Sequence, residues 1–358
     1  MRILTVIGTR PEIIRLSRIV PLLDEHCDHV FVHTGQNSSD NLSKVFFNEL
    51  EVRQPDEFVD VDTSSFGRQL ATLFERFELL LDKHRPDRVL ILGDTNSALV
   101  AFNCKRRMIP VYHMEAGNRC YDDRVPEEVN RRVIDHCSSI LLPYTHRSAA
   151  NLVREGFDRD RIFVVGNPIF EVLEHYRPGI EASDALNRHA LTAGRFLLAT
   201  MHRAENVDDP ETFRRLCGAL GQVAALYGWP LILSVHPRIE KKIDRSPFGD
   251  ADIRMIPAMP FFEFVHLEMK AGLVLTDSGT VQEECAIFGV PVITIRDTTE
   301  RPETVEAGTN IVASTDPERI LAAARFTKTV VQPMGAAPPE YIEPNVSAKI
   351  LRILLGNR

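Results

Sequence analysis

The chain contains 358 residues, 44% of them hydrophobic and 26% charged, which is ordinary for a soluble globular protein with two domains. Its formal net charge of −8 argues against nucleic acid or an anionic membrane as the main partner. Its 6 cysteines lie far apart without a C-x-x-C pair, which disfavours structural zinc and favours reduced thiols. We see neither a signal-peptide pattern nor an apolar run near the roughly 18 residues of a membrane span, so we expect a cytoplasmic protein.

The amino-terminal half alternates short apolar runs with segments of helical periodicity. Continuous apolar runs of this kind are typical of parallel strands that helices cover on both faces. In chain order, the runs are ILTVIG, HVFVHTG, RVLILGD, IPVYHME, SILLPYT and RIFVVG. The pattern predicts a doubly wound, Rossmann-like α/β domain over residues 1–175.

After residue 190 the alternation begins again. The second set of apolar runs is RFLLATMH, PLILSVHP, IRMIPA, GLVLTDSG, VPVITIRD and TNIVAS. The polar stretch 175–194 lacks strand signals and is expected to carry the linker. We therefore predict a second doubly wound domain over residues 176–344. An amphipathic pattern after Pro344 predicts a closing helix over residues 345–358.

Polar residues follow most of the predicted strands. In doubly wound sheets, ligands bind at these carboxyl ends, where loops lead into helices. Turns alone explain many Gly and Asp residues, but three His and four Arg exceed what turns need, so we predict that the domains face each other across a shared ligand cleft. The strand-end segments are Gly8-Thr9-Arg10, Gly35-Gln36-Asn37, Gly93-Asp94-Thr95-Asn96-Ser97, His113-Met114-Glu115, Met201-His202-Arg203, His236-Pro237-Arg238, Asp277-Ser278-Gly279 and Arg296-Asp297.

The usual glycine-rich nucleotide motifs are missing. IGTRPE lacks the later glycines of G-x-G-x-x-G, and no P-loop pattern occurs. DSGTVQEE (277–284) offers a loop at a helix start that can receive a phosphate, with Glu283 and Glu284 expected in the first turn. An N-cap by Ser278 explains this segment equally well. An anion such as pyrophosphate is favoured by five strand-end cations: Arg10, His202, Arg203, His236 and Arg238.

The stretch MEAGNRCYDDRVPEE concentrates five acids in fifteen positions. Glu115 closes a predicted strand, and Glu127 lies at the start of a predicted helix. Asp94 ends the preceding strand, and sequential strands are commonly neighbours, so these three carboxylates are expected to converge. We expect Asp122 and Asp123 to be solvated loop charges. The alternative for the whole stretch is salt bridging with Arg119, Arg124, Arg131 and Arg132.

Six segments occur in order along nearly the whole chain: GTRPEIIRL, GDTNS, HMEAGNR with VPEEVNRR, HRAEN, HPR, and DSGTVQEE with IRDTTERPE. Together they resemble the non-hydrolysing UDP-N-acetylglucosamine 2-epimerases. The resemblance implies a GT-B-like pair of Rossmann-type domains with a UDP-sugar in the cleft. It also implies activity without NAD or an essential metal, usually as a homodimer, with a product that feeds surface polysaccharide synthesis.

The resemblance also assigns roles to individual residues. It implies that Arg10 lies on the phosphate side, that Ser278 and Gly279 lie at the pyrophosphate, and that Glu284 lies at the ribose. The implied catalytic positions are Asp94, Glu115, Glu127 and His202. The further candidates for substrate contact are Arg15, Gln36, His113, Arg203, His236 and Arg296.

The chain departs from the family pattern at two places. Arg15 replaces a common lysine, which keeps the charge but changes a point charge into a planar fork. In GQNSSDNL, Gln36 matches a run tied to allosteric activation by a second UDP-sugar, whereas Asn37 and Ser39 do not, so that control is expected to be absent or altered.

EAGNRC and RVPEE resemble relatives that act on UDP-6-deoxy-L-hexosamines to give UDP-N-acetyl-L-fucosamine. RDTTERPE and LPYTHRSAANLVREGF resemble the glucosamine branch, which we favour.

The implied reaction needs both acids and cations. The C2 proton of an N-acetylhexosamine is not adjacent to a carbonyl, so we predict elimination of UDP to a 2-acetamidoglucal and re-addition from the other face. Carboxylates stabilise positive character at C1 and exchange the C2 proton, while cations and a helix terminus stabilise the departing phosphate. The alternatives are a GT-B glycosyltransferase, a hydrolysing epimerase that releases N-acetylmannosamine, and a catalytically silent UDP-sugar sensor.

Overall fold

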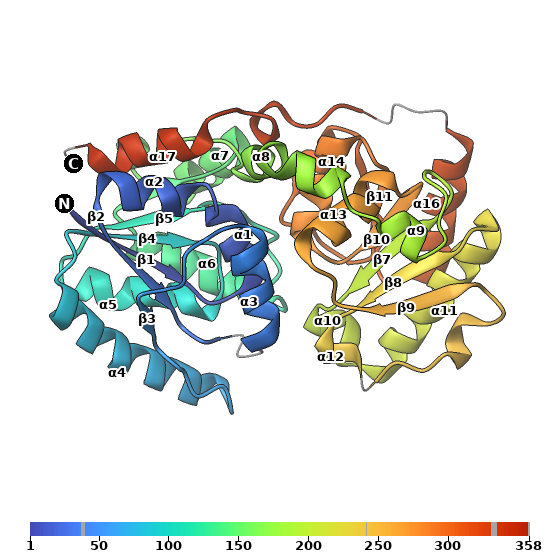
Figure 1. Cartoon of the computed structure of the whole chain (residues 1–358), viewed down its shortest axis with the longest axis horizontal. Helices are drawn as coiled ribbons and strands as arrows, with labels where there is room; N and C mark the ends of the chain where they lie inside the picture. The colour runs from blue at the N-terminus through green and yellow to red at the C-terminus, as the bar shows by residue number, and fades with distance from the viewer. Residues whose placement is uncertain (37–39, 241, 331–334, 357–358) are drawn as a thin grey trace. The chain divides into compact units, whose positions relative to one another are not determined.

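The computed structural model describes residues 1–36, 40–240, 242–330 and 335–356. The chain divides into two compact units (Figure 1). Unit 1 comprises Met1–His175 together with Glu340–Arg358, and unit 2 comprises Tyr176–Pro339. Each unit is built around its own parallel sheet.

The sheet of unit 1 has the strand order β3-β2-β1-β4-β5-β6. Its central strand β1 pairs in parallel with β2 and β4, and Val6 lies opposite both Val32 and Ile91. The central strands are almost completely buried, as expected for strands covered on both faces. The strands are β1 (Arg2–Ile7), β2 (Asp28–His33), β3 (Glu57–Phe58), β4 (Arg88–Leu92), β5 (Val111–Met114) and β6 (Ile140–Leu142).

Helices lie on both faces of this sheet, with α4 and α5 on one side and α2 and α17 on the other (Figure 1). Leu4 and Val6 of β1 share one buried core with Leu73 and Phe77 of α4. The unit 1 helices are α1 (Arg10–Leu16), α2 (Ile19–His26), α3 (Asp40–Glu49), α4 (Phe66–His84), α5 (Ala101–Arg106), α6 (Pro126–Cys137), α7 (His146–Arg154) and α17 (Val346–Leu355), with 3-10 turns η1 (Asn96–Val100) and η2 (Arg159–Arg161); α8 (Ile169–Glu181) and η4 (Pro339–Tyr341) each cross a boundary between the units.

The sheet of unit 2 has the order β12-β11-β10-β7-β8-β9, again with parallel pairing throughout. Leu197 and Ala199 of β7 face one core, and Leu198 faces a second, so this sheet is also covered on both faces. The doubly wound α/β class predicted for both halves is confirmed. The elements are β7 (Leu197–Met201), β8 (Leu231–Val235), β9 (Ile253–Pro257), β10 (Leu273–Thr276), β11 (Val292–Thr294), β12 (Asn310–Val312), α9 (Ala185–Arg188), α10 (Ala204–Val207), α11 (Pro210–Tyr227), α12 (Pro237–Glu240), η3 (Ser246–Phe248), α13 (Phe261–Lys270), α14 (Gly279–Phe288), α15 (Pro302–Glu306) and α16 (Pro317–Thr329).

The chain returns to unit 1 after completing unit 2. Helix α17 packs against α2, and both oxygens of Glu171 accept hydrogen bonds from Ser347, from its backbone N at 2.9 Å and from its Oγ at 2.6 Å. The Arg88 guanidinium donates to the carbonyl oxygen of Leu354. Val346, Ile350 and Leu354 are fully buried, so the helix closes the unit through its apolar face.

Replacing Leu354 with Ala should lower the free energy of unfolding of unit 1 by about 2–5 kcal/mol, because it removes a fully buried side chain from the α17 interface. The matched control is Leu355→Ala on the same helix, where the side chain is 42% exposed and a change within about 0.5 kcal/mol is expected. Urea unfolding followed by circular dichroism measures both. Equal losses in the two variants would show that the packing of α17 does not stabilise the unit.

Candidate functional site

Several candidate residues of unit 1 follow three neighbouring strands, β1, β4 and β5, whose carboxyl ends lie at one edge of the sheet. Leu92 lies opposite Met114, and the N–H of Gly93 donates to the Met114 carbonyl at 3.1 Å. A Cβ atom on Gly93 would lie only 3.7 Å from Oε2 of Glu115. The loop that carries Asp94 therefore lies directly beside the Glu115 carboxylate.

Glu115 is held by a buried ion pair. Arg15 Nη1 donates to Glu115 Oε2 at 2.7 Å, and the two side chains are 2% and 10% exposed. The Arg15 guanidinium also lies over the Tyr144 ring, 5.5 Å from its centroid. Asn118 Nδ2 donates to the other carboxylate oxygen at 3.2 Å. Glu115 has a positive φ of 68°, so the backbone turns sharply directly after β5.

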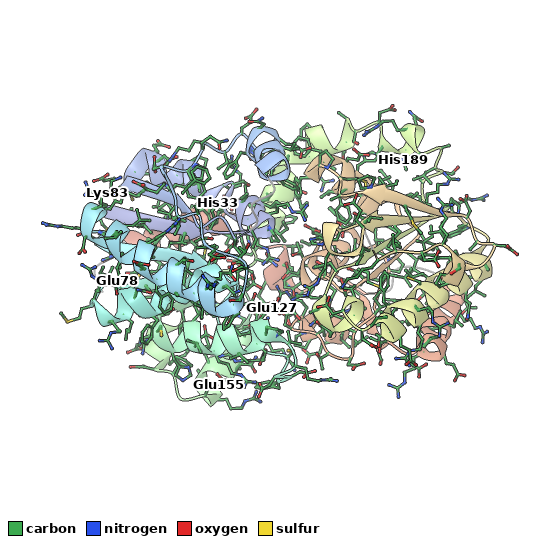
Figure 2. The ribbon with its side chains drawn as sticks, turned by 90° about the horizontal axis from the view of Figure 1, so that it is seen from below. His33, Glu78, Lys83, Glu127, Glu155 and His189 are labelled. Carbon is green, nitrogen blue, oxygen red and sulfur yellow. The ribbon has the colours of Figure 1, made fainter. Side chains whose placement is uncertain are left out.

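Asp94 is tied to the helix that carries Glu127. Arg131 of α6 donates Nε to Asp94 Oδ2 at 3.0 Å, and Asn130 Nδ2 donates to the Asp94 carbonyl at 3.0 Å. Glu127 lies half-buried in the first turn of α6 and is labelled in Figure 2. The Asp94 loop thus touches both the strand end at Glu115 and the helix of Glu127.

The alternative of salt bridging with the arginines between residues 119 and 132 holds for Asp94, which pairs with Arg131, and for other acids of the stretch, whereas Glu115 pairs with Arg15. Asp122 pairs with Arg124 at 2.7 Å, and Asp123 pairs with Arg132 at 3.1 Å. Glu128, which the sequence analysis passed over, is fully buried and pairs with both Arg131 and Arg132. Its carboxylate also accepts the backbone N–H groups of Cys120 and Tyr121. Burial alone would raise the pKa of Glu128, but the Cys120 hydrogen bond and the Arg131 charge outweigh burial and lower it.

Glu12 was also missed, although the Thr9-to-Glu12 spacing is that of a capping box. Its Oε2 accepts the backbone N–H groups of Gly8 at 2.8 Å and Thr9 at 2.6 Å, and its Oε1 accepts from Thr95 Oγ1 at 3.1 Å. Glu12 therefore joins the loop after β1 to the loop after β4. It is 2% exposed, and burial raises the pKa of its carboxyl to about 7 despite these hydrogen bonds.

His113 lies beneath the strand edge and is fully buried. Its Nδ1 lies 2.8 Å from Asp135 Oδ1, and its Nε2 lies 2.9 Å from the Gly93 carbonyl. Asp135 pairs in turn with Arg119 at 2.7 Å. In this geometry His113 supports the Gly93 turn.

Two further candidates lie at the ends of β1 and β2. Arg10 is half-buried over the Phe46 ring, 5.7 Å from its centroid, and burial lowers the pKa of its guanidinium. Gln36 Oε1 accepts from the backbone N of Ser97 at 3.0 Å and from its Oγ at 2.8 Å. The control motif over 35–42 cannot be followed further, because Asn37 and Ser39 lie outside the described residues.

In unit 2, Asp277 organises the loop of His202. Its Oδ2 accepts the backbone N–H groups of His202 and Arg203, each at 2.9 Å, and His202 Nδ1 lies 3.0 Å from Oδ1. Burial alone would raise the pKa of Asp277, but His202 and these N–H groups hold it well below its usual range. The His202 ring lies 5.5 Å from that of His236, so residues after β7 and β8 meet.

Helix α14 begins at Gly279 without a side-chain hydrogen bond from Ser278. Ser278 is the N-cap residue of α14, as expected, but its side chain makes no capping hydrogen bond. The expectation that Glu283 and Glu284 occupy the first turn is wrong, because a helix that starts at Gly279 places them in its second turn. Glu283 pairs with Arg301, while Glu284 is 3% exposed and contacts Glu268 of α13.

Glu300, another residue that the sequence analysis missed, joins two predicted cations. Its Oε2 accepts from Arg296 Nη1 at 2.9 Å, and its Oε1 accepts from Arg203 Nη2 at 3.3 Å. A Cβ atom on Gly279 would lie 2.7 Å from Glu300 Oε1, so the Glu300 carboxylate lies directly against the start of α14. Arg203, Arg296 and the start of α14 thus form one cluster.

Within the described ranges, no group of three or more His, Cys, Asp or Glu side chains is arranged to hold a metal ion. The same residues contain no helix that is both long enough and apolar enough to cross a membrane.

Comparison with known proteins gives one consistent result. The family model of UDP-N-acetylglucosamine 2-epimerase matches residues 23–355. A UDP-N-acetylglucosamine 2-epimerase of Methanocaldococcus jannaschii is 38% identical over 336 residues, which cover 91% of this chain and 92% of that protein. A UDP-2,3-diacetamido-2,3-dideoxy-D-glucuronate 2-epimerase of Pseudomonas aeruginosa is 34% identical over 336 residues, again 91% and 92% of the two chains. The crystal structure of a Methanocaldococcus jannaschii UDP-GlcNAc 2-epimerase in complex with UDP-GlcNAc and UDP superposes with a TM-score of 0.92 at 36% identity and covers 99% of each chain.

Glu12→Gln should change how stability depends on pH. Burial raises the pKa of the Glu12 carboxyl from 4.5, its value in the unfolded chain, to about 7 in the folded protein. The free energy of unfolding of wild type is therefore highest below pH 4.5 and falls by up to about 3 kcal/mol as the pH rises to 7. The variant should therefore gain stability relative to wild type between pH 5 and pH 8, as measured by denaturant unfolding. Glu25→Gln, where the side chain is 71% exposed, is the control and should track wild type. Parallel pH profiles of Glu12→Gln and wild type would contradict the burial argument.

Proposed function

The chain belongs to the UDP-N-acetylglucosamine 2-epimerase family, and we propose that it interconverts UDP-N-acetylglucosamine and UDP-N-acetylmannosamine by eliminating and re-adding UDP. The observation that carries the proposal is the ion-paired Glu115 carboxylate beside the Asp94 loop in unit 1. The phosphate-binding partner would be the cluster around Gly279 in unit 2. We further propose that the enzyme works as a homodimer in the cytoplasm.

The acids of unit 1 suit the sugar ring. In the first step, a carboxylate takes the proton from C2, the C1–oxygen bond breaks, and UDP departs with the bonding electrons to leave a 2-acetamidoglucal. In the second step, C2 accepts a proton on the opposite face and a β-phosphate oxygen of UDP attacks C1. The Asp94 loop contacts both Glu115 and the helix that carries Glu127, so these carboxylates would supply both a proton acceptor and charge that stabilises C1.

The Arg15–Glu115 pair favours a carboxylate over a carboxylic acid at residue 115. A guanidinium at 2.7 Å stabilises the charged form of a side chain that is only 10% exposed. Glu115 is therefore suited to accept a proton or to stabilise positive charge at C1. The proton donated to the other face would come from another group of the cluster.

The cations of unit 2 suit the nucleotide. The start of α14 offers backbone N–H groups, and Arg203 and Arg296 converge there through Glu300. His202, bound to Asp277, would stabilise the negative charge that develops on the departing β-phosphate. Glu284 in the second turn of α14 would accept hydrogen bonds from the ribose hydroxyls. Arg10 and His236 would complete the contacts with the phosphates.

A second candidate substrate is a UDP-6-deoxy-L-hexosamine, which the segments EAGNRC and RVPEE favour. The Pseudomonas aeruginosa relative is named for yet another UDP-hexosamine, so the family accommodates different ring substituents. The C2 chemistry is the same in each case. A hydrolysing epimerase would differ only in letting water reach the glucal.

Incubation with UDP-N-acetylglucosamine in D₂O tests the reaction. We expect proton NMR to show loss of the C2 proton signal and the appearance of UDP-N-acetylmannosamine, because the proton that returns to C2 comes from solvent. Free N-acetylmannosamine would identify a hydrolysing enzyme. Tight UDP binding without exchange would contradict this substrate, and a parallel incubation with the UDP-6-deoxy-L-hexosamine would separate the second candidate from a transferase or sensor.

Glu115→Gln should reduce turnover by roughly 10² or more while UDP still binds, because it removes the charge and the proton acceptor but keeps the size. Asp123→Asn is the matched control, since this carboxylate belongs to the same loop region but is 74% exposed and pairs with Arg132. Thermal unfolding of both variants separates catalysis from folding. Near-normal turnover of Glu115→Gln would remove Glu115 from the catalytic set.

A further inference from the structure

A buried histidine and a buried aspartate lie beneath the turn that carries Glu115. His113 of β5 and Asp135 of α6 are both fully buried, and His113 Nδ1 lies 2.8 Å from Asp135 Oδ1. The other ring nitrogen, Nε2, lies 2.9 Å from the carbonyl oxygen of Gly93. Because the ring does not meet solvent, it can influence a reaction only through the groups that it binds.

These contacts require a proton on both ring nitrogens of His113. A carbonyl oxygen only accepts hydrogen bonds, so Nε2 carries the proton that it donates to Gly93. Asp135 is an ionised acceptor, because burial alone would raise its pKa, but the His113 hydrogen bond and the Arg119 charge outweigh burial and lower it. A neutral ring would therefore turn the Nδ1 lone pair toward an acceptor at 2.8 Å. The proton between the two side chains resides on His113, since imidazole is a stronger base than a carboxylate.

The second oxygen of Asp135 is anchored as well. Oδ2 accepts the backbone N–H of Gly117 at 3.2 Å and pairs with Arg119 at 2.7 Å. The Arg119 side chain is fully buried and donates to both oxygens of Glu155, at 2.9 Å and 2.7 Å. Glu155 is 22% exposed, so this row of groups reaches the surface of unit 1 where Figure 2 labels Glu155. An imidazolium at His113 makes the charges of the row alternate and cancel.

The pair holds the turns on both sides of Glu115. His113 binds the carbonyl of Gly93, whose N–H is already bound to β5. Asp135 binds the N–H of Gly117, two residues after Glu115. Both glycines have a positive φ, 71° and 78°, which glycine adopts without steric cost. One buried pair therefore fixes the backbone from which the Glu115 side chain extends.

We propose that His113 is a positioning residue: its imidazolium, held by Asp135, fixes the two glycine turns that flank Glu115. This inference rests on the proposed function, in which Glu115 acts at C1 or C2 of the sugar. The Arg15 contact fixes the end of the Glu115 side chain, whereas the imidazolium fixes the backbone that carries it. With both nitrogens occupied, His113 neither accepts a proton from the sugar nor donates one to it.

Nitrogen-15 NMR of the histidine rings tests the charge. At about pH 8, where an ordinary imidazole is neutral, both ring nitrogens of His113 should carry a proton. His29 is the internal control: its Nδ1 also faces a carboxylate, 2.6 Å from Asp24, but its Nε2 faces the Thr5 hydroxyl, which can donate. Burial lowers the pKa of His29, so its ring should carry one proton. A single protonated nitrogen on His113 in wild type would overturn the proposal, and this measurement needs no variant to fold.

Turnover per folded protein tests the positioning role. In His113→Gln, which keeps one donor but loses the charge, kcat should fall by roughly 10- to 100-fold with KM within about twofold of wild type, because small displacements of a reacting group are costly. Circular dichroism and titration calorimetry with UDP measure the folded fraction, so a loss that only reflects unfolding disappears on correction. The matched control is His136→Gln, an exposed histidine next to Asp135 on α6, which should leave both constants unchanged.

The outcomes separate this role from the proposed function. Near-normal corrected kcat in His113→Gln, or an equal loss in His136→Gln, would overturn the role of His113 while the proposed function stands. A wild type that does not turn over UDP-N-acetylglucosamine would overturn the proposed function instead, and the NMR signal would still decide the charge of His113.

Discussion

The buried ion pair between Arg15 and Glu115 is the interaction on which the arrangement of unit 1 depends. A carboxylate that is 10% exposed has lost most of its hydration, and Arg15, itself 2% exposed, compensates for that loss. The planar guanidinium stacks on Tyr144 while it binds the carboxylate, which a lysine ammonium cannot do in the same way. The position of the Glu115 carboxylate is therefore fixed by its contact with the packed Arg15 side chain of α1.

Buried acids shape the loops of both units. In unit 1, Glu12 joins two strand-end loops through their N–H and hydroxyl groups. Glu128 accepts hydrogen bonds from the backbone N–H groups of Cys120 and Tyr121. In unit 2, Asp277 accepts hydrogen bonds from the backbone N–H groups of His202 and Arg203. Glu300 accepts hydrogen bonds from the guanidinium groups of Arg203 and Arg296. Each of these carboxylates compensates for its burial with donors from a neighbouring loop. The loops after the strands thus acquire fixed positions without regular secondary structure.

The sequence predicts the fold and the strand-end candidates well. In a parallel sheet each strand is a continuous apolar run, and the loops that follow the strands all lie at the same edge of the sheet. The sequence cannot distinguish a buried acid from a solvated one. The Thr9-to-Glu12 spacing gives a signal for Glu12, whereas Glu268 and Glu300 are recognised as buried only from the tertiary structure. The first-turn placement of Glu283 and Glu284 was wrong because α14 begins at Gly279, which places both acids in the second turn.

The discontinuity of unit 1 has a consequence for biosynthesis. Residues 340–358 are translated only after the whole of unit 2, yet α17 packs on α2, which the ribosome released long before. At about 5–20 residues per second, the apolar surface of α2 waits for many seconds in the nascent chain. The continuous unit can therefore mature first, and the amino-terminal one is finished last. Unit 1 is therefore the first to be synthesised and the last to be complete.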